Sequence, residues 1–421
     1  MLNRDDNQLL TRTGPETPMG KLMRRYWLPA LLSEELPEPD GEPLQLRLLG
    51  QNFVAFRDTN GRVGVLDENC PHRGASLAYA RNQECGLRCI YHGWKVDADG
   101  RVVDMPTEPP TSTFRDRLRH PAYPVVEAGD VIWTYLGPSG SQPDFPNWEW
   151  TQAPKEQRGV TRILQECNYA QGVEGTIDSA HSDYLHSSDI RGRPQDHAPR
   201  LEAIDTPYGF KYAAIRTPDS AADTFKYVRL TLFVAPFFAF IPPFRQGRLA
   251  SDDDRPGEVV VQQAFVPIDD EHNAFFTFAY NRRGLLPRYW RQHASEFGIQ
   301  GHAGRPVRNR ANKHLQDRVA MRAGNWSGIV GINPQDFAVA EGMGPILDRS
   351  REHLGATDVA IIRYRRRMLD AARALEAGQE PPPGLGGDVA YRRLASDERL
   401  IPVDAAWEDL STFAEDVTRA R

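Results

Sequence analysis

Short runs of alternating apolar and polar residues dominate the chain between residues 44 and 136. Alternation with a period of two, bounded by Asp- and Gly-rich turns, is typical of strands with one buried face. Residues 1–30 instead show short helical stretches broken by turns. The pattern predicts a small antiparallel β domain, with strand regions at 44–57, 63–67, 86–96 and 131–136.

The pattern changes after a Pro- and Gly-rich stretch at 137–154, which resembles a linker. Residues 165–186 are helical in character, and four longer strand-like runs follow, at 210–216, 227–241, 259–266 and 274–280. Because no helical stretch separates these runs, their sheet should be antiparallel. Two helices should follow, at 310–321 and from about 357 to 378. The chain is therefore predicted to be an α+β protein with domains at 1–150 and 151–421.

Composition narrows the protein class. The chain has 421 residues, 40% of them hydrophobic, and a formal net charge of -6, which gives no reason to expect a nucleic-acid partner. No apolar run reaches the ~18–20 residues of a membrane helix. The first residues lack a basic segment followed by an apolar one, so no secretory signal is expected. We expect a cytoplasmic enzyme without a membrane partner.

Two Cys/His boxes are the first candidate site. Cys70 and His72 lie in CPHRGA, and Cys89 and His92 follow shortly afterwards in CIYHGW. Two such pairs on hairpin loops can close on one metal centre. Zinc accepts the same ligands. A glycine close behind each histidine favours an iron–sulfur cluster, because it lets backbone N–H groups approach the cluster sulfurs.

Two further cysteines, Cys85 and Cys167, complete the set of four. Since the two boxes already supply four ligands, both are expected to be inert thiols.

The second candidate site lies at 168–186. Asp178 and His181 are three residues apart and would share one face of a helix, and His186 follows five residues later. Two imidazoles and one carboxylate form the facial triad of non-haem Fe(II) oxygenases, which leaves three coordination positions open. Residue types alone leave the carboxylate undecided among Asp336, Glu174, Asp178, Asp183, Glu341 and Asp348.

These motifs, together with LLTRTGPETPMGKLMRRYWLPALLSEEL near the start and QDFAVAEGMGPILDRSREHLGATD at 335–358, give the chain its resemblance to a family. It resembles the catalytic α subunits of Rieske non-haem iron oxygenases, and most of all the phthalate 4,5-dioxygenase-like group, which includes aryl O-demethylases. Respiratory Rieske proteins carry an extra cysteine in each box, but Ala75 and Tyr91 stand at those places here.

The resemblance implies a Rieske-type antiparallel β domain followed by a helix-grip (START-like) catalytic domain. It implies that Cys70, His72, Cys89 and His92 hold a [2Fe–2S] cluster, and that His181, His186 and Asp336 hold a mononuclear Fe(II). Asp178 would bridge a Rieske histidine of one subunit and an iron-ligating histidine of the next, within a homotrimer or a dimer of trimers. The chain has no G-x-G-x-x-G motif, so electrons from NAD(P)H should come through a separate flavin and ferredoxin-type reductase.

The sequence indicates the substrate less clearly than it indicates the two metal sites. Strand alternation places Arg229 on one face with Tyr227 and Thr231, and places Arg216 on one face with Tyr212. Either arginine could pair with an aromatic carboxylate, or with an acid of the protein itself.

Three functions therefore remain open. The first is hydroxylation of an aromatic carboxylate, meaning a phthalate- or benzoate-like ring or a diaryl ether. The second is O-demethylation of a methoxylated biaryl acid with release of formaldehyde. The third, of another class, is a Rieske electron carrier without oxygenase activity. Such a carrier needs only about 100 residues, and a second domain of its own is unusual for it.

Overall fold

A computed structural model describes residues 2–190, 198–218, 223–242, 259–379, 382–385 and 389–410. Two compact units are present. One comprises residues 24–145, and the other comprises residues 1–23 together with 146–421. The first unit is called the small unit below, and the second the large unit.

The small unit consists almost entirely of short antiparallel strands. Three sheets have the orders β1-β11-β10, β2-β3-β4-β9 and β5-β6-β7-β8. This confirms the antiparallel β domain predicted from the alternating pattern. Its strands and one helix are β1 (Trp27–Leu32), β2 (Leu44–Leu48), β3 (Gln51–Arg57), β4 (Val63–Asp67), β5 (Arg81–Gln83), β6 (Gly86–Arg88), β7 (Lys95–Val96), β8 (Val102–Asp104), α3 (Phe114–Arg117), β9 (Ala122–Tyr123), β10 (Val125–Ala128) and β11 (Val131–Tyr135).

The large unit is built on one nine-stranded sheet of order β13-β14-β15-β16-β17-β18-β12-β19, with β20 paired to β15. All its pairs are antiparallel except β12 with β19. The strands are β12 (Arg158–Gln165), β13 (Arg200–Thr206), β14 (Gly209–Arg216), β15 (Phe225–Val234), β16 (Phe238–Ile241), β17 (Val259–Pro267), β18 (Asn273–Asn281), β19 (Ala303–Gly304) and β20 (Asp397–Pro402).

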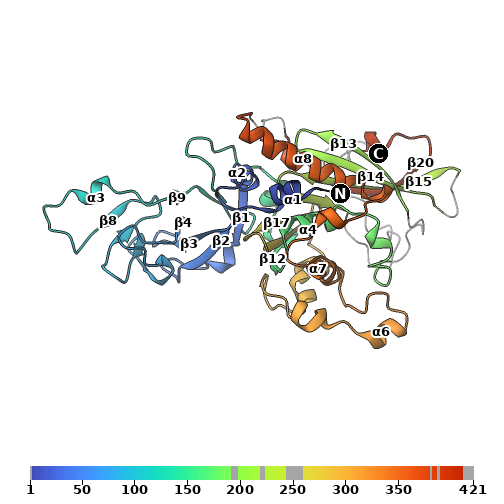
Figure 1. The fold of residues 1–421 in the computed structure, drawn as a ribbon. Coiled ribbons are helices and arrows are strands. Elements are labelled where there is room, and N and C mark those ends of the chain that lie inside the picture. The colour runs from blue at the N-terminus through green and yellow to red at the C-terminus, as the bar shows by residue number, and fades with distance from the viewer. Residues whose placement is uncertain are drawn as a thin grey trace. The chain divides into compact units, whose positions relative to one another are not determined.

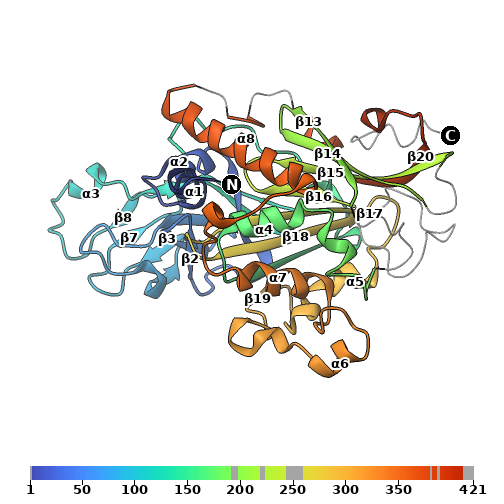
Figure 2. The same cartoon turned by 45° about the vertical axis from the view of Figure 1, so that its right-hand side comes forward.

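Helices cover one face of this sheet. Figure 2 shows α4, α7 and α8 in front of the strands, and α4 contacts β16 and β17 while α8 contacts β13 and β14. The antiparallel sheet covered by helices is thus as predicted. The helices of this unit are α1 (Arg4–Thr11), α2 (Pro18–Met23), α4 (Tyr169–Thr176), α5 (Arg288–Arg291), α6 (Arg318–Arg322), α7 (Ile332–Gly342) and α8 (Val359–Glu376).

Strand register decides which side chains face these helices. Thr231 of β15 pairs with Tyr212 of β14, and Phe265 of β17 pairs with Phe275 of β18. Because side chains alternate along a strand, this face also receives Arg229. The opposite face carries Phe278, which stacks on Trp150 with ring centroids 4.4 Å apart. The helix-covered face therefore carries Arg229 and Thr231 together with Phe265 and Phe275, and the opposite face packs against Trp150.

The N-terminal helices differ from the predicted domain division, which grouped residues 1–150. In the structure α1 and α2 pack on α8, as Figure 1 also shows, and Leu10 and Leu22 are fully buried. Residues 146–150 likewise belong to the large unit, because Trp148 and Trp150 are buried. Contacts between segments near opposite ends of the chain leave no local trace in the sequence, which explains the difference.

Two predicted helices are shorter than expected. The helix expected over 165–186 ends with α4 at Thr176, so Asp178 and His181 lie in a turn and not on one helix face. The helix expected over 310–321 is broken. Lys313, His314 and Leu315 have φ near +50°, in the left-handed region, and the α-helical part of the expected range begins at Arg318, with α6. Within the described residues, no helix combines the length and apolar character needed to span a membrane.

Candidate metal centres

Two loops of the small unit have the same backbone design. In the first, the N–H of Gly74 donates to the carbonyl of Cys70, and the N–H of Cys70 donates to that of Ala75. In the second, Gly93 and Cys89 repeat these bonds, with Trp94 in the place of Ala75. Both glycines have φ near +75°, where other residues are strained. Each box therefore forms a tight turn that presents one cysteine and one histidine.

The four side chains fit a [2Fe–2S] cluster. Cys70 and Cys89 are each 3% exposed, and the rings of His72 and His92 lie 4.4 Å apart. Burial raises the pKa of the Cys70 thiol to about 11, whereas backbone N–H groups of His72 and Arg73 hydrogen-bond the sulfur and act in the opposite direction. Nδ1 of His72 is buried without a hydrogen-bond partner, as expected for an atom reserved for a metal.

Trp94 holds one of these imidazoles in place. Its ring stacks on His72 with centroids 4.3 Å apart and an interplanar angle of 9°, and its Nε1 donates to Thr107. Cys85 and Cys167 lie elsewhere. The sulfur of Cys85 accepts from Asn60, and Cys167 is fully buried in the large unit.

The second constellation lies in the large unit, where a turn after α4 meets α7. Asn168 caps α4 by accepting from the N–H of Ala170. After α4 ends, Asp178 Oδ1 accepts from the N–H of Ala180 at 2.8 Å, which starts a short 3-10 turn over His181–Asp183. Asp336 comes from the second turn of α7, far from both histidines in the chain.

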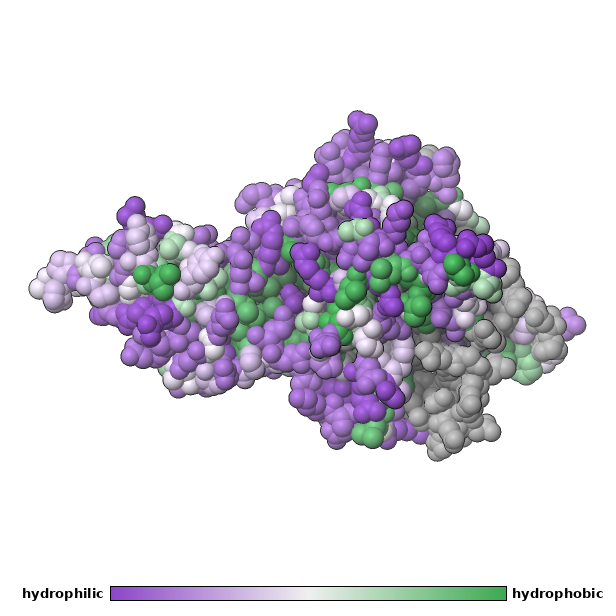
Figure 3. Space-filling view, turned by 90° about the horizontal axis from the view of Figure 1, so that it is seen from below, coloured by the Kyte–Doolittle hydropathy of each residue, from purple (hydrophilic) through white to green (hydrophobic). Residues whose placement is uncertain are grey.

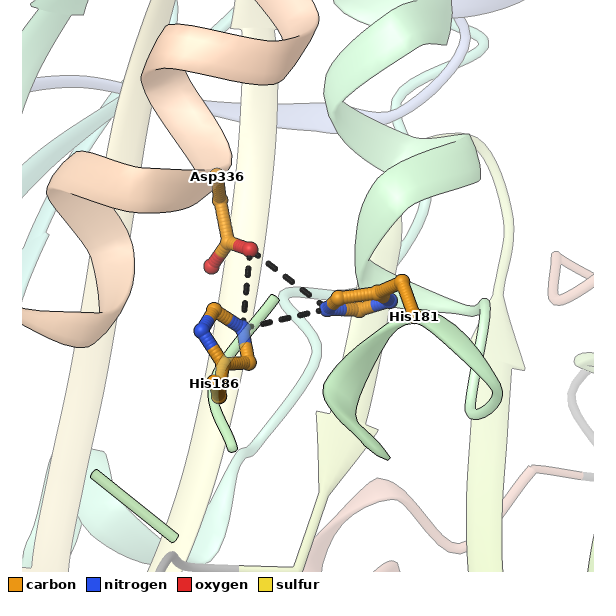
Figure 4. A group of neighbouring side chains, drawn as sticks. All are labelled: His181, His186 and Asp336. Atoms are coloured by element: carbon orange, nitrogen blue, oxygen red, sulfur yellow. Dashed lines mark hydrogen bonds and ion pairs between the residues drawn. The ribbon is translucent and has the colours of Figure 1, made fainter. Parts of the chain in front are cut away.

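Three of the predicted residues converge. Nε2 of His181 lies 3.2 Å from Nε2 of His186, and Oδ1 of Asp336 lies 3.4 Å and 3.0 Å from these two nitrogens. Figure 4 shows the three side chains pointing toward one another. A metal bound at about 2.1 Å with ligands at right angles would separate its donors by about 3 Å. The donor atoms therefore match one face of an octahedral metal site.

Electrostatics favour a cation among these atoms. Burial acts to lower the pKa of His181, but Asp178 and Asp336 outweigh it and raise that pKa to about 10. Burial would raise the pKa of Asp336, yet His186 and His181 bring it well below its ordinary value. The carboxylates thus stabilise positive charge at these nitrogen atoms, where a proton and a metal ion would compete for binding.

Side chains behind the triad orient it, and the sequence analysis did not anticipate them. Nδ1 of His186 lies 2.6 Å from Oε1 of Gln335, whose amide nitrogen donates to Asp189 and to the carbonyl of Ile329. On the other side, Asn333 donates to Asp336 Oδ2 at 3.3 Å. Orientation of ligands by such neighbours is general in metal sites. The sequence signal was three polar residues close together, Asn333, Gln335 and Asp336, in a helix that proves to be largely buried.

The other acids that the residue types left open are engaged elsewhere. Glu174 accepts hydrogen bonds from Arg349 and Arg365, and Asp183 pairs with Arg216. The remaining two have local roles: Glu341 accepts from the N–H of Glu166, and Asp348 caps a 3-10 turn at Arg349–Arg351. Asp178 lies beside the triad, with its Oδ2 3.7 Å from Nδ1 of His181. Of these acids, Asp336 alone reaches both histidines.

A cavity opens beside the triad, and its empty volume is about 410 Å³. Concave spaces with a few converging polar groups are where ligands usually bind. The cavity is lined by Gly175, Thr176, Asp178, Ser179, His181, Ser182, Tyr212, Arg229, Thr231, Ile241, Gln263, Asn333 and Asp336.

The two arginines singled out in the sequence have different positions. Arg229 lies in the cavity wall, held by Glu398 at 2.5 Å and by the carbonyl of Pro242 at 3.1 Å. Arg216 is fully buried and does not line this cavity. It donates to Asp183 at 2.5 Å and to the carbonyl of Ser179, on either side of His181. Arg216 thereby fixes the turn that carries the histidine.

Comparison with known proteins agrees with these two sites. Residues 26–115 match the family described as Rieske [2Fe-2S] domain, and residues 134–420 match the family described as LigXa C-terminal domain like. The chain therefore belongs to the Rieske non-haem iron oxygenases, as one of their oxygenase subunits. Members of this family carry a Rieske cluster and a mononuclear iron.

Individual relatives agree along nearly the whole chain. The phthalate 4,5-dioxygenase oxygenase subunit of Pseudomonas putida is 44% identical, over 97% of this chain and 94% of its own. The 3-chlorobenzoate-3,4-dioxygenase oxygenase subunit of Comamonas testosteroni is 38% identical over 96% of both. The 5,5'-dehydrodivanillate O-demethylase oxygenase subunit of a Sphingobium strain is 32% identical, over 90% of this chain and 83% of its own.

A solved structure shows the same fold. Dicamba monooxygenase bound to dicamba superposes with a TM-score of 0.60 at 19% identity, over 85% of this chain and all of that one. The chain is thus the oxygenase component of a ring-hydroxylating or O-demethylating system that works with a reductase or ferredoxin. This membership excludes the electron-carrier alternative.

Proposed function

We propose that this subunit hydroxylates an aromatic carboxylate, using O2 and electrons from NAD(P)H. Cys70, His72, Cys89 and His92 would hold the Rieske cluster, and His181, His186 and Asp336 the mononuclear iron. The observation that carries the proposal is that a guanidinium, that of Arg229, lines the same cavity as His181 and Asp336. Three relatives support it, because phthalate, 3-chlorobenzoate and 5,5'-dehydrodivanillate are all aromatic carboxylates.

The residues of the chain have separate tasks in this proposal. The iron, when bound, supplies the chemistry that activates O2. Arg229 would hold the substrate carboxylate, because a guanidinium presents a planar fork of donors that matches it. Its contacts with Glu398 and Pro242 keep that fork at the cavity wall. The rest of the cavity would then set the position of the aromatic ring relative to Asp336.

O-demethylation of a methoxylated biaryl acid is the alternative, and the Sphingobium relative favours it. The two reactions need the same residues and differ in which substrate atom faces the iron. Turnover of phthalate, benzoates and a methoxylated biaryl acid with a surrogate reductase separates them. We expect a dihydrodiol or catechol product without formaldehyde. Stoichiometric formaldehyde would establish the alternative, and turnover of uncharged arenes alone would overturn both.

Arg229→Met tests the proposed carboxylate contact. The variant should bind aromatic acids about 10–100-fold more weakly and their methyl esters almost unchanged, because a charged hydrogen bond contributes about 1.5–3 kcal/mol. Titration of the anaerobic enzyme with acid and ester measures this. Arg229→Met together with Glu398→Gln removes the acid that the first change leaves behind, and so separates lost attraction from new repulsion. Thr231→Val, in the same wall, is the uncharged control. Equal losses for acid and ester would contradict the contact.

We also propose that the chains assemble head to tail into trimers or dimers of trimers, with a separate flavin and ferredoxin-type reductase as partner, in the cytoplasm. Large hydrophobic side chains are exposed at both candidate centres. Ile90 and Tyr91 are 65% and 55% exposed in the second Cys/His box of the small unit, and Tyr184 and Trp326 are 50% and 55% exposed near the triad. Figure 3 shows hydrophobic residues, in green, among the hydrophilic ones on the surface seen from below. Exposed apolar surface of this kind is typical of interfaces.

Asp178 is the proposed link across that interface, from His181 of one chain to a Rieske histidine of the next. Asp178→Asn should leave the iron content and the assembly unchanged and slow the reoxidation of the reduced cluster, because the amide cannot carry the same charge between the histidines. Mass photometry and single-turnover spectroscopy measure the two effects. A monomeric wild-type protein, or reoxidation at the wild-type rate in the variant, would contradict the assignment.

A further inference from the structure

A second cavity adjoins the first on the other side of Asp336. Its empty volume is about 270 Å³. It shares four wall residues with the larger cavity, namely Gly175, Thr176, Asn333 and Asp336. The remaining wall comes from Gln165, Gln171, Gly172, Phe265, Phe275, Phe337 and Ala340. The small cavity therefore lies between α4, α7 and the sheet, directly beside a proposed iron ligand.

Three phenylalanine rings dominate this wall. Phe275 lies 5.0 Å from Phe265 and 5.5 Å from Phe337, measured between ring centroids. Gly172 permits the approach of the sheet to α4, because a Cβ there would lie 2.1 Å from the Phe265 ring. The aromatic wall therefore forms where the sheet, α4 and α7 pack closely, and the small cavity is the space left between them.

The polar residues of the wall have partners within the protein. The amide nitrogen of Gln171 donates to the carbonyls of Ala340 and Gly344, and its oxygen accepts from the N–H of Leu347. Thr176 donates to Gln263. A buried water needs two to four polar partners, and apolar cavities without them stay dry and take up apolar molecules such as xenon.

Size and charge restrict what the small cavity can hold. Its volume of about 270 Å³ is smaller than the 410 Å³ of the larger cavity. The wall contains no cationic side chain, and its one charged residue is Asp336. An aromatic carboxylate therefore finds its counter-charge only in the larger cavity, at Arg229.

We propose that the small cavity is a binding site for dioxygen, next to the mononuclear iron. The inference rests on the proposed function, in which the larger cavity is filled by the organic substrate. An uncharged diatomic molecule matches the apolar wall and the available space. Dioxygen would bind on the side of Asp336 away from Arg229. Gly175, Thr176 and Asn333 would lie between it and the substrate.

Ala340→Leu tests this site, because Ala340 lines the small cavity and not the larger one. The added side chain should raise the KM for O2 severalfold and leave the dissociation constant of the aromatic acid unchanged. Ile241→Phe is the matched control, since Ile241 lines only the larger cavity. It should weaken binding of the acid and leave the KM for O2 unchanged. An unchanged KM for O2 in Ala340→Leu, or a loss of acid binding as large as that of O2, would overturn the proposal.

Xenon binding gives a readout that does not depend on turnover. Xenon, observed in crystals of the holoenzyme under pressure, should occupy the small cavity of the wild type and be absent from Ala340→Leu. Should that variant not fold, the smaller change Ala340→Val, at the same position of the wall, serves the xenon measurement. Xenon binding without turnover of any aromatic acid would refute the proposed substrate class alone. Turnover without xenon in the cavity would refute the dioxygen site alone.

Discussion

Replacement of His181 by alanine should lower the iron content from about three to about two atoms per chain and abolish oxygenation, with two acid-labile sulfides retained. The reason is that Nε2 of His181 is one of three converging donors in the large unit, whereas the four Cys/His residues of the small unit are untouched. Metal and sulfide analysis of anaerobically purified protein, together with the visible spectrum of the cluster, measures both quantities.

His272→Ala is the matched control for this experiment. His272 also lies in the large unit and also pairs with an aspartate, Asp269, at 2.9 Å, but it is not part of the triad. It should retain all the iron. Two irons in the wild type as well as in the variant would show that the triad does not bind iron, and loss of the cluster spectrum in His181→Ala would show that the two sites are not independent.

Replacement of Glu174 by alanine should lower the free energy of unfolding by about 3–5 kcal/mol, because it removes the carboxylate partner of the buried Arg349 and leaves Arg365 paired with Glu352 alone. Glu174 accepts from Arg349 at 2.8 Å and 2.9 Å and from Arg365 at 2.7 Å, and all three side chains are at most 8% exposed. Chemical denaturation of the variant and the wild type measures the difference. Glu271→Gln, at an exposed acid of the same unit, should change stability by no more than about 0.5 kcal/mol.

Glu174 should also make the stability of the protein depend on pH. Burial would raise the pKa of Glu174, but Arg349 and Arg365 outweigh it and bring that pKa below the ordinary value of 4.5. A carboxylate with a lowered pKa in the folded state contributes stability above its unfolded pKa and loses it as the pH falls through the folded one. The wild type should therefore lose stability below about pH 4.5 more steeply than Glu174→Ala. Parallel acid limbs, or a change below about 1 kcal/mol at neutral pH, would contradict this account of the network.

Glu174 matters for the site because of its place in the chain. It lies on α4, four residues before Asp178, while Arg365 lies on α8 and Arg349 in the turn after α7. The ion pairs thus join the two segments that carry the triad to the helix that covers the sheet. Loss of this network should also loosen the geometry of His181 and Asp336.

The local pattern of the sequence determined the strands of this protein and its first candidate site. The alternation of apolar residues set the antiparallel strands and placed Arg229 and Thr231 on one face, as the register confirms. The spacing of cysteine and histidine, each pair followed by a glycine, marked the first site, since two tight turns need only a few residues each. Such features depend on neighbours in the chain, and they can be predicted from the sequence alone.

Tertiary structure decided the rest. The residue types left six acids open for the triad, and only the packing of α7 against α4 brings Asp336 to the histidines while Arg349 and Arg216 engage Glu174 and Asp183. The amide of Gln335 behind His186, and the small apolar cavity, also depend on segments that are far apart in the chain. Burial and charge compensation are properties of the packed structure. The sequence supplied the groups, and long-range packing selected which of them meet.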